Sequence, residues 1–210
     1  RSQGFLFRYQ LQFLKGIIAE ENLFYGSLGG SDTGILFNRK ESVIHPGREL
    51  ISFSLTAVPP SVTLLSWLNA YTDSIHAKAA YSWFSRIQGN SPRELPSDTD
   101  TRRRLCGILQ DLGLDIADYS IIPDSDHKSP AAFLVHSPYE GCTYELPWEE
   151  ESTGTKKLLS LLPSVLASLD DGSLMMADDL DCILHPHALR YLIALYSNRE
   201  KNPHNAQLLF

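Results

Sequence analysis

Two short segments of the sequence hold polar residues in an order that suits phosphate chemistry. The first, EESTGTKKLL at residues 150–159, is a polar, glycine-containing turn that runs into a helix. The residues expected at the start of that helix are Ser152, Thr153, Gly154 and Thr155. Backbone N–H groups there have no intrahelical partner and the dipole is positive, which suits phosphate. Gly154 would also let a phosphate approach the backbone closely. Taken alone, the turn is more typical of an N-cap without a ligand.

The second segment, SLMMADDLDCILHP at residues 173–186, is an apolar strand that ends in two acids. In a parallel α/β sheet, ligands bind beyond the carboxyl ends of the strands, which is where Asp178 and Asp179 would lie. Carboxylates at such a place can hold Mg²⁺ together with phosphate oxygens, and an adjacent carboxylate can orient an attacking water. From the strand alone, the favoured interpretation is a buried strand whose acids cap the next turn.

The elements that must position these segments predict a mixed fold. The first 55 or so residues read as an antiparallel β-meander, with a turn at Lys15-Gly16 and strands at residues 5–14, 17–26 and 35–40. Residues 26–34 are predicted to form a loop. Residues 61–89 have helical spacing and predict one or two helices, and a proline-containing linker follows at 90–98.

The second half predicts a capped helix, three short strands and then a parallel layer. Asp100 or Thr101 would cap the helix at 99–114, and the short strands would be 117–124, 131–138 and 141–148. The order that follows is helix, strand, helix with Pro186 near its first turn, and strand, at residues 152–172, 173–179, 185–198 and 205–210. This order indicates a parallel α/β layer, so the expected fold class is α/β, with an α+β character overall.

Taken together, the segments EESTGTKKLLSLLP, SLMMADDLDCILHP and AQLLF resemble the C-terminal half of an ABC-type ATPase head. The resemblance is closest to the bacterial AAA-family ATP-binding proteins related to the OLD nucleases, RecF and the SMC heads. Many of these are abortive-infection or phage-defence proteins. More weakly, FRYQLQF, EENLFYG and ILFNRK resemble the antiparallel β-subdomain of that family. The resemblance implies a partial ATPase head with a β-subdomain at 1–58, a helical lobe at 59–115 and an ATPase core at 116–210.

In that family the ExSxGT stretch is the signature motif. The resemblance implies that Ser152, Gly154 and Thr155, with Thr153 in the same turn, would contact the γ-phosphate of ATP held by the opposite protomer. ATP and Mg²⁺ are the cofactors that follow.

The second segment resembles Walker B and the D-loop of the family. Asp178 would then bind Mg²⁺, and Asp179 would occupy the catalytic position that polarises the attacking water. His185, in the D-loop, would lie at the dimer interface near the nucleotide.

Three departures from the family pattern stand out. Asp179 replaces the usual Glu, and because its side chain is one methylene shorter we expect slow hydrolysis. The P-loop pattern GxxxxGK[ST] is absent from these residues, since GSLGGSDTG lacks the Gly-Lys-Ser/Thr end. The sequence also stops at Phe210, before the strand-end switch histidine of the family. These residues therefore resemble the middle and C-terminal portion of an ATPase.

The composition of the 210 residues is that of a globular protein. Hydrophobic residues make up 43% and charged residues 20%, which excludes disorder as the main interpretation. There is no apolar run of about 18 residues, and the start lacks the zones of a signal peptide. A net charge of −7 argues against nucleic-acid affinity over the whole surface. Three widely spaced cysteines favour neither disulfides nor a zinc site, so we expect a reduced, cytoplasmic chain.

Two further features have a simple and a sharper interpretation. The basic run Arg102, Arg103 and Arg104 is favoured as a solvated face, with contact to nucleic acid or a partner as the alternative. His185 and His187 form an HPH pair, but without a third ligand a metal site there is disfavoured.

The resulting hypothesis is a segment of an ABC-class ATPase that binds Mg-ATP between two heads and hydrolyses it slowly, in anti-phage defence or DNA transactions. The expected partner is a second head, in a homodimer or higher oligomer. A nuclease or toxin effector and nucleic acid are further candidates, and a membrane is not. The complete protein would be an ATP hydrolase, whereas these residues alone would be inactive without a P-loop. The alternative is a non-catalytic dimerisation or interaction module derived from such an ATPase.

Overall fold

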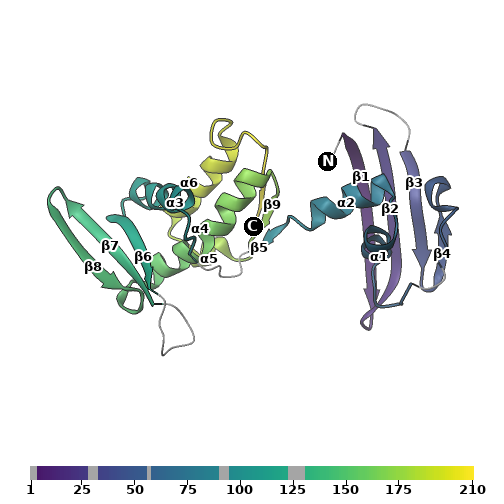
Figure 1. Ribbon diagram of the computed structural model, residues 1–210, viewed down its shortest axis with the longest axis horizontal. Coiled ribbons are helices and arrows are strands. Elements are labelled where there is room, and N and C mark those ends of the chain that lie inside the picture. Colours follow the sequence, from purple (N-terminus) through teal and green to yellow (C-terminus); the bar gives the residue numbers. More distant parts are fainter. Residues whose placement is uncertain (1–3, 28–32, 56–57, 90–94, 123–130) are drawn as a thin grey trace. The chain divides into compact units, whose positions relative to one another are not determined.

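Figure 1 shows the computed structural model of the chain, which describes residues 4–27, 33–55, 58–89, 95–122 and 131–210. The predicted loop at 26–34, the linker at 90–98 and the end of the strand at 117–124 lie partly outside these ranges. The chain divides into two units, residues 1–85 and 86–210. Each unit is described by itself. The three-part division at residues 58 and 115 stays a prediction.

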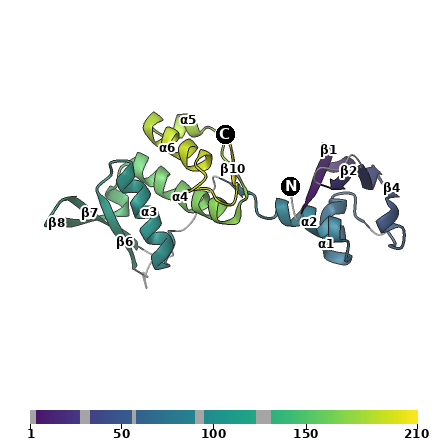
Figure 2. The same ribbon diagram turned by 90° about the horizontal axis from the view of Figure 1, so that it is seen from above.

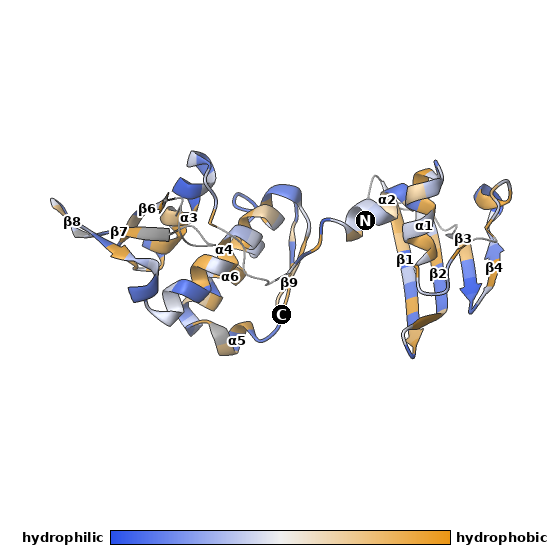
Figure 3. Ribbon diagram, turned by 60° about the horizontal axis from the view of Figure 1, so that its bottom comes forward, coloured by the Kyte–Doolittle hydropathy of each residue, from blue (hydrophilic) through white to orange (hydrophobic). Residues whose placement is uncertain are grey.

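An antiparallel sheet in the order β1-β2-β3-β4 forms the first unit. Its strands are β1 (Phe5–Leu14), β2 (Ile17–Ser27), β3 (Thr33–Lys40) and β4 (Val43–Pro46). Hydrophobic and hydrophilic residues alternate along part of β1 and stand in short blocks along β2 and β3 (Figure 3). Lys15 and Gly16 have φ of 50° and 80° and place Leu14 opposite Ile17, which is a two-residue hairpin turn. The predicted meander is confirmed.

Two helices, α1 (Leu64–Tyr71) and α2 (Ile75–Phe84), cover one face of this sheet (Figure 2), and a short 3-10 helix, η1 (Arg48–Leu50), follows β4. The core between the helices and the sheet consists of Leu23, Leu36, Phe37, Leu50, Leu64, Leu65, Leu68, Ala77 and Ala80. The helical stretch predicted over residues 61–89 is wrong at its end. The helix stops at Phe84, and Gln88–Gly89 form strand β5, because these two residues pair with a strand far along the chain.

A parallel sheet in the order β10-β9-β5 lies in the second unit, with β9 (Leu174–Met176) in the centre and β10 (Gln207–Leu209) at one edge. The helices of this unit are α3 (Thr99–Asp111), α4 (Thr153–Asp171), α5 (Leu180–Ile183) and α6 (Pro186–Ser197). Their apolar residues and Met175 of β9 share one hydrophobic core. The predicted parallel layer is confirmed, and the chain has the expected mixed α/β fold.

Three antiparallel strands complete the second unit, in the order β6-β7-β8. They are β6 (Ile116–Ile122), β7 (Ala131–Tyr139) and β8 (Cys142–Pro147), and the 3-10 helix η2 (Trp148–Glu150) leads from β8 towards α4. Buried Tyr119 and Leu134 join this sheet to the core beneath α3 and α4. Along the chain, this sheet comes directly before the turn that precedes α4.

Local signals set the ends of the long helices. α4 begins after Ser152, whose side chain is the N-cap, and ends at Gly172, which adopts the left-handed conformation with φ 62°. Both ends were predicted. α3 begins at Thr99, where the predicted range began, but its N-cap is Asp98, which accepts the N–H of Thr101 at 2.8 Å, so the predicted cap at Asp100 or Thr101 is wrong. Among the described residues, no helix is long and apolar enough to cross a bilayer.

Candidate functional site

The turn that precedes α4 is held by its own side chains. Ser152 Oγ accepts the N–H of Thr155 at 3.0 Å and lies 2.8 Å from Thr155 Oγ1. On the other side, Glu151 Oε2 accepts the N–H of Ser152 at 3.0 Å. Ser152, Thr153 and Gly154 are exposed, whereas Thr155 and Glu151 are buried. The turn is a fixed helix N-terminus that presents backbone N–H groups and the positive end of the helix dipole.

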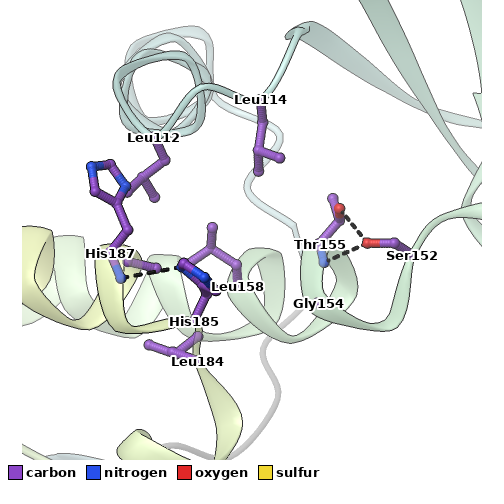
Figure 4. A pocket seen from close by; sticks show the side chains of 10 residues that line it. Leu112, Leu114, Ser152, Gly154, Thr155, Leu158, Leu184, His185 and His187 are labelled. Atoms are coloured by element: carbon purple, nitrogen blue, oxygen red, sulfur yellow. Dashed lines mark hydrogen bonds between the residues drawn. The ribbon is translucent and has the colours of Figure 1, made fainter.

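A hollow of about 270 Å³ lies beside this turn. It is lined by Leu112, Leu114, Ser152, Gly154, Thr155, Leu158, Leu184, His185, His187 and Ala188. Figure 4 shows Ser152 and Thr155 on one side of it, and His185 and His187 on the other. The structure therefore brings together two parts of the predicted site, the turn before α4 and the D-loop-like histidine, although they are about 30 residues apart in the sequence.

His185 holds its place in the hollow as the N-cap of α6. Its Nδ1 accepts the N–H of His187 at 3.2 Å, and Pro186 occupies the first turn as predicted. Neither histidine belongs to a group of three potential metal ligands among the described residues. The hollow thus has polar side chains at its rim and an apolar wall, to which Leu112 and Leu114 contribute from the connection between α3 and β6.

Gly154 has open space where a side chain would stand. A Cβ built on this residue would meet Ser152 Oγ at 3.9 Å and nothing closer, and the backbone is not left-handed. The fold therefore does not need a glycine here, unlike at Gly172, where a Cβ would collide with the His204 carbonyl oxygen. A glycine that the fold does not require leaves the backbone of the first helical turn open to a ligand.

The two predicted acids follow β9, at the carboxyl end of the parallel sheet. Asp178 and Asp179 are exposed, and Asp179 has a left-handed backbone with φ 55° directly before α5. The described lining of the hollow does not include them. Asp179, Asp181 and Cys182 have ligand atoms within 4.8 Å of one another, all exposed. Negative charge from Asp181 raises the pKa of the Cys182 thiol, so the free thiol keeps its proton at neutral pH.

Sequence reasoning missed a buried histidine between two carboxylates. His136, on β7, places Nδ1 2.8 Å from Asp115 Oδ1 and Nε2 2.5 Å from Glu151 Oε1. The ring stacks on Tyr144, with centroids 5.0 Å apart and planes at 7°. Only the position of Glu151 beside Ser152 could have drawn attention to this cluster, because its members are 15 and 21 residues apart.

The protonation of His136 is set by opposing effects. Burial lowers the pKa of His136, but the hydrogen bonds to Asp115 and Glu151, and their negative charges, outweigh burial and raise the pKa above the usual 6.5. The imidazolium form is therefore retained further towards neutral pH than in an isolated histidine.

The basic run at the start of α3 is engaged in ion pairs. Arg102 Nε lies 3.2 Å from Asp118 Oδ1, Arg103 pairs with Asp100 at 2.7 Å, and Arg104 makes two bonds of 2.9 and 2.7 Å to Asp170. These pairs agree with the simpler interpretation of a solvated face. Contact of this run with nucleic acid stays a prediction.

Comparison with known protein families gave a match over most of the chain. The family model described as "AAA domain, putative AbiEii toxin, Type IV TA system" matches residues 15–210, which is nearly the whole chain. The comparisons with curated proteins and with solved structures gave no match.

Proposed function

Because this chain belongs to that AAA domain family, and so has a nucleotide-binding, ATPase-like domain, we propose that its turn at residues 152–155 contacts the phosphates of ATP held by a second head. In this proposal the chain supplies the signature side of an ATP site, and the nucleotide lies between two heads arranged head to tail. The family description supports an abortive-infection or toxin–antitoxin role for the ATPase.

One observation carries the proposal. Ser152, Gly154 and His185 line the same hollow, at the exposed N-terminus of a long helix with a glycine that the fold does not require. Backbone N–H groups at such a terminus bind phosphate oxygens, and the helix dipole favours their negative charge. The hydroxyl of Ser152 is already oriented by the amide of Thr155, so little freedom is lost when a phosphate binds.

The acids after β9 fit the magnesium that such an ATP site requires. Both carboxylates are exposed at the carboxyl end of a parallel strand, and oxygen ligands of this kind are what Mg²⁺ prefers. Asp178 would hold the ion, which neutralises phosphate charge when it is bound. Asp179 would orient the attacking water, and because its side chain is one methylene shorter than that of the usual Glu, we propose that hydrolysis is slow.

Substitution of Gly154 by Ala in the full-length protein tests the proposal. A methyl group fits the free protein at this position, and a helical Gly→Ala change stabilises by about 0.5–1 kcal/mol. The same methyl would stand between the backbone and a phosphate, so we expect ATP turnover to fall by about tenfold, a loss of about 1.4 kcal/mol of binding.

The matched control is Gly107→Ala. Gly107 lies inside α3, and a Cβ there would meet no atom within 4 Å. Both variants should keep or raise the melting temperature, and only Gly154→Ala should lose ATPase activity. Equal ATPase activity in the two variants would show that the turn does not contact the nucleotide.

A further inference from the structure

A continuous series of hydrogen bonds leads from the antiparallel sheet β6-β7-β8 into the turn before α4. Asp115 precedes β6, His136 lies on β7, and Glu151 bonds to both His136 and the amide of Ser152 through its two oxygens. Ser152 in turn accepts the amide of Thr155. Glu151 is therefore the one side chain in this series that joins the histidine to the turn.

We propose that His136 is a positioning residue for nucleotide contact, which in its doubly protonated form holds Glu151 and so fixes the turn at residues 152–155. This rests on the proposed function of that turn. His136 acts through Glu151 and does not itself touch the nucleotide.

The hydrogen-bonding capacity of imidazole is the first argument. Two carboxylates face the ring from opposite edges, and a carboxylate only accepts. The imidazolium ion donates to both, whereas neutral imidazole donates to one and turns a lone pair towards the other. After loss of the proton, one of the two carboxylates therefore loses its donor, and neither faces a positive charge on the ring.

Burial decides the consequence for Glu151. The side chain of Glu151 is 5% exposed, whereas that of Asp115 is 37% exposed. Water can replace the histidine at Asp115 but not at Glu151, so neutral His136 keeps its one N–H for Glu151 and loses the positive charge that balances this buried carboxylate. Without this balancing charge Glu151 is held less firmly as the acceptor of the Ser152 amide, which loosens the start of α4.

Among the described groups that face His136, the two carboxylates are its ionic partners. Asp115 approaches from the start of β6, Glu151 from the end of η2, and the ring of Tyr144 on β8 covers one face. Burial and these same negative charges raise the pKa of Tyr144, so its hydroxyl stays neutral and does not compete for the imidazolium. Cys142 lies on the same strand as Tyr144 and is a free thiol.

The first experiment measures amide hydrogen exchange at residues 152–155 in the full-length protein without nucleotide. His136→Gln removes the charge and donates to one carboxylate only, so exchange at the Ser152 and Thr155 amides should become faster. His76→Gln is the matched control, since His76 also lies 2.5 Å from a carboxylate, Glu49, and packs on Tyr25, but in the first unit. This control should leave exchange at the turn unchanged.

The second experiment measures the KM for ATP between about pH 6 and pH 9. The pKa of His136 is raised, so its contribution is complete at low pH and is lost as pH rises through the raised pKa. The wild-type KM should therefore rise with pH, with a smaller change in kcat. His136→Gln should show a KM about tenfold higher at low pH and a flat profile.

Two outcomes separate this inference from the proposed function. If His136→Gln matches His76→Gln in both exchange and KM profile, the positioning role is wrong. If the wild-type protein does not hydrolyse ATP, the proposed function fails, and the exchange comparison alone decides whether His136 holds the turn. Glu151→Gln keeps the shape of its side chain without the charge and should speed exchange in the same way, which covers the case in which His136→Gln does not fold.

Discussion

At the scale of single residues, substitution of Asp179 can distinguish the proposed slow ATPase from a non-catalytic module. The left-handed backbone at this position, with φ 55°, is one that Asp adopts more readily than Glu. The shorter acid therefore fits the local conformation of the chain. If Asp179 is a catalytic acid, its shorter side chain lies further from the attacking water than that of a Glu would.

Asp179→Glu in the full-length protein should increase ATP hydrolysis, because a carboxylate one methylene longer reaches further towards the water. We expect a gain of about tenfold with a stability loss of about 1 kcal/mol from the left-handed backbone. Steady-state phosphate release and a thermal melt measure the two effects.

The control for this substitution is Asp181→Glu, which lengthens a neighbouring exposed acid in α5 that has no proposed catalytic role. Unchanged hydrolysis in Asp179→Glu, with intact folding, would favour the interaction module over the ATPase. A gain in both variants would point to a general effect of longer acidic side chains near the sheet edge.

At the scale of elements, the end of α4 fixes where β9 begins and so where the two acids lie. Gly172 ends the helix with φ 62°, and only Ser173 separates it from β9. The carbonyl oxygen of His204 stands within clashing distance of the position that a Cβ on Gly172 would take. The glycine is thus required both by its backbone conformation and by the close approach of another segment.

Gly172→Ala should therefore destabilise the protein more than Gly113→Ala. Gly113 has φ 81°, and a Cβ added there would meet no atom within 4 Å, so its substitution costs the left-handed strain alone, about 1–2 kcal/mol. Gly172→Ala adds the clash with the His204 carbonyl. Chemical denaturation of both variants measures the difference, and equal losses would mean that the chain near His204 moves aside freely.

The sequence predicted those element ends that depend on nearby residues. The ends of α4 and the turn of the β1–β2 hairpin follow from local chemistry, that is from Ser152, Gly172 and Lys15-Gly16. Strand β5 could not be predicted, because Gln88 and Gly89 become a strand only by pairing with Met175 and Met176.

The candidate site likewise has one part that the sequence predicted and another that depends on the fold. The turn at residues 152–155 carries a local signal, whereas its meeting with His185 and its support by His136 depend on packing between distant segments. The geometry of the acids relative to the turn likewise depends on the sheet, and the roles of Asp178 and Asp179 stay predictions.

At the scale of the whole molecule, the described residues form two hydrophobic clusters, one in each unit. In the first unit, a buried ionic network joins the sheet to α1. Glu21 is 0% exposed and accepts the amides of Leu64 and Leu65 at 2.6 and 3.0 Å, while Arg39, 1% exposed, donates to the carbonyls of Pro59 and Val62. All the residues named in this network belong to the first unit.

Glu21→Ala should destabilise the first unit by about 3–5 kcal/mol, because it leaves the buried Arg39 charge unpaired and the first amides of α1 without an acceptor. Asp73→Ala is the control, since it breaks an exposed ion pair with Lys78 that contributes little to stability. Hydrogen exchange should show protection lost in β2, β3 and α1 of Glu21→Ala and kept in α4. Parallel loss of protection in α4 would mean that the two clusters unfold as one cooperative structure, in which case a change in the first unit would also reach the turn at residues 152–155.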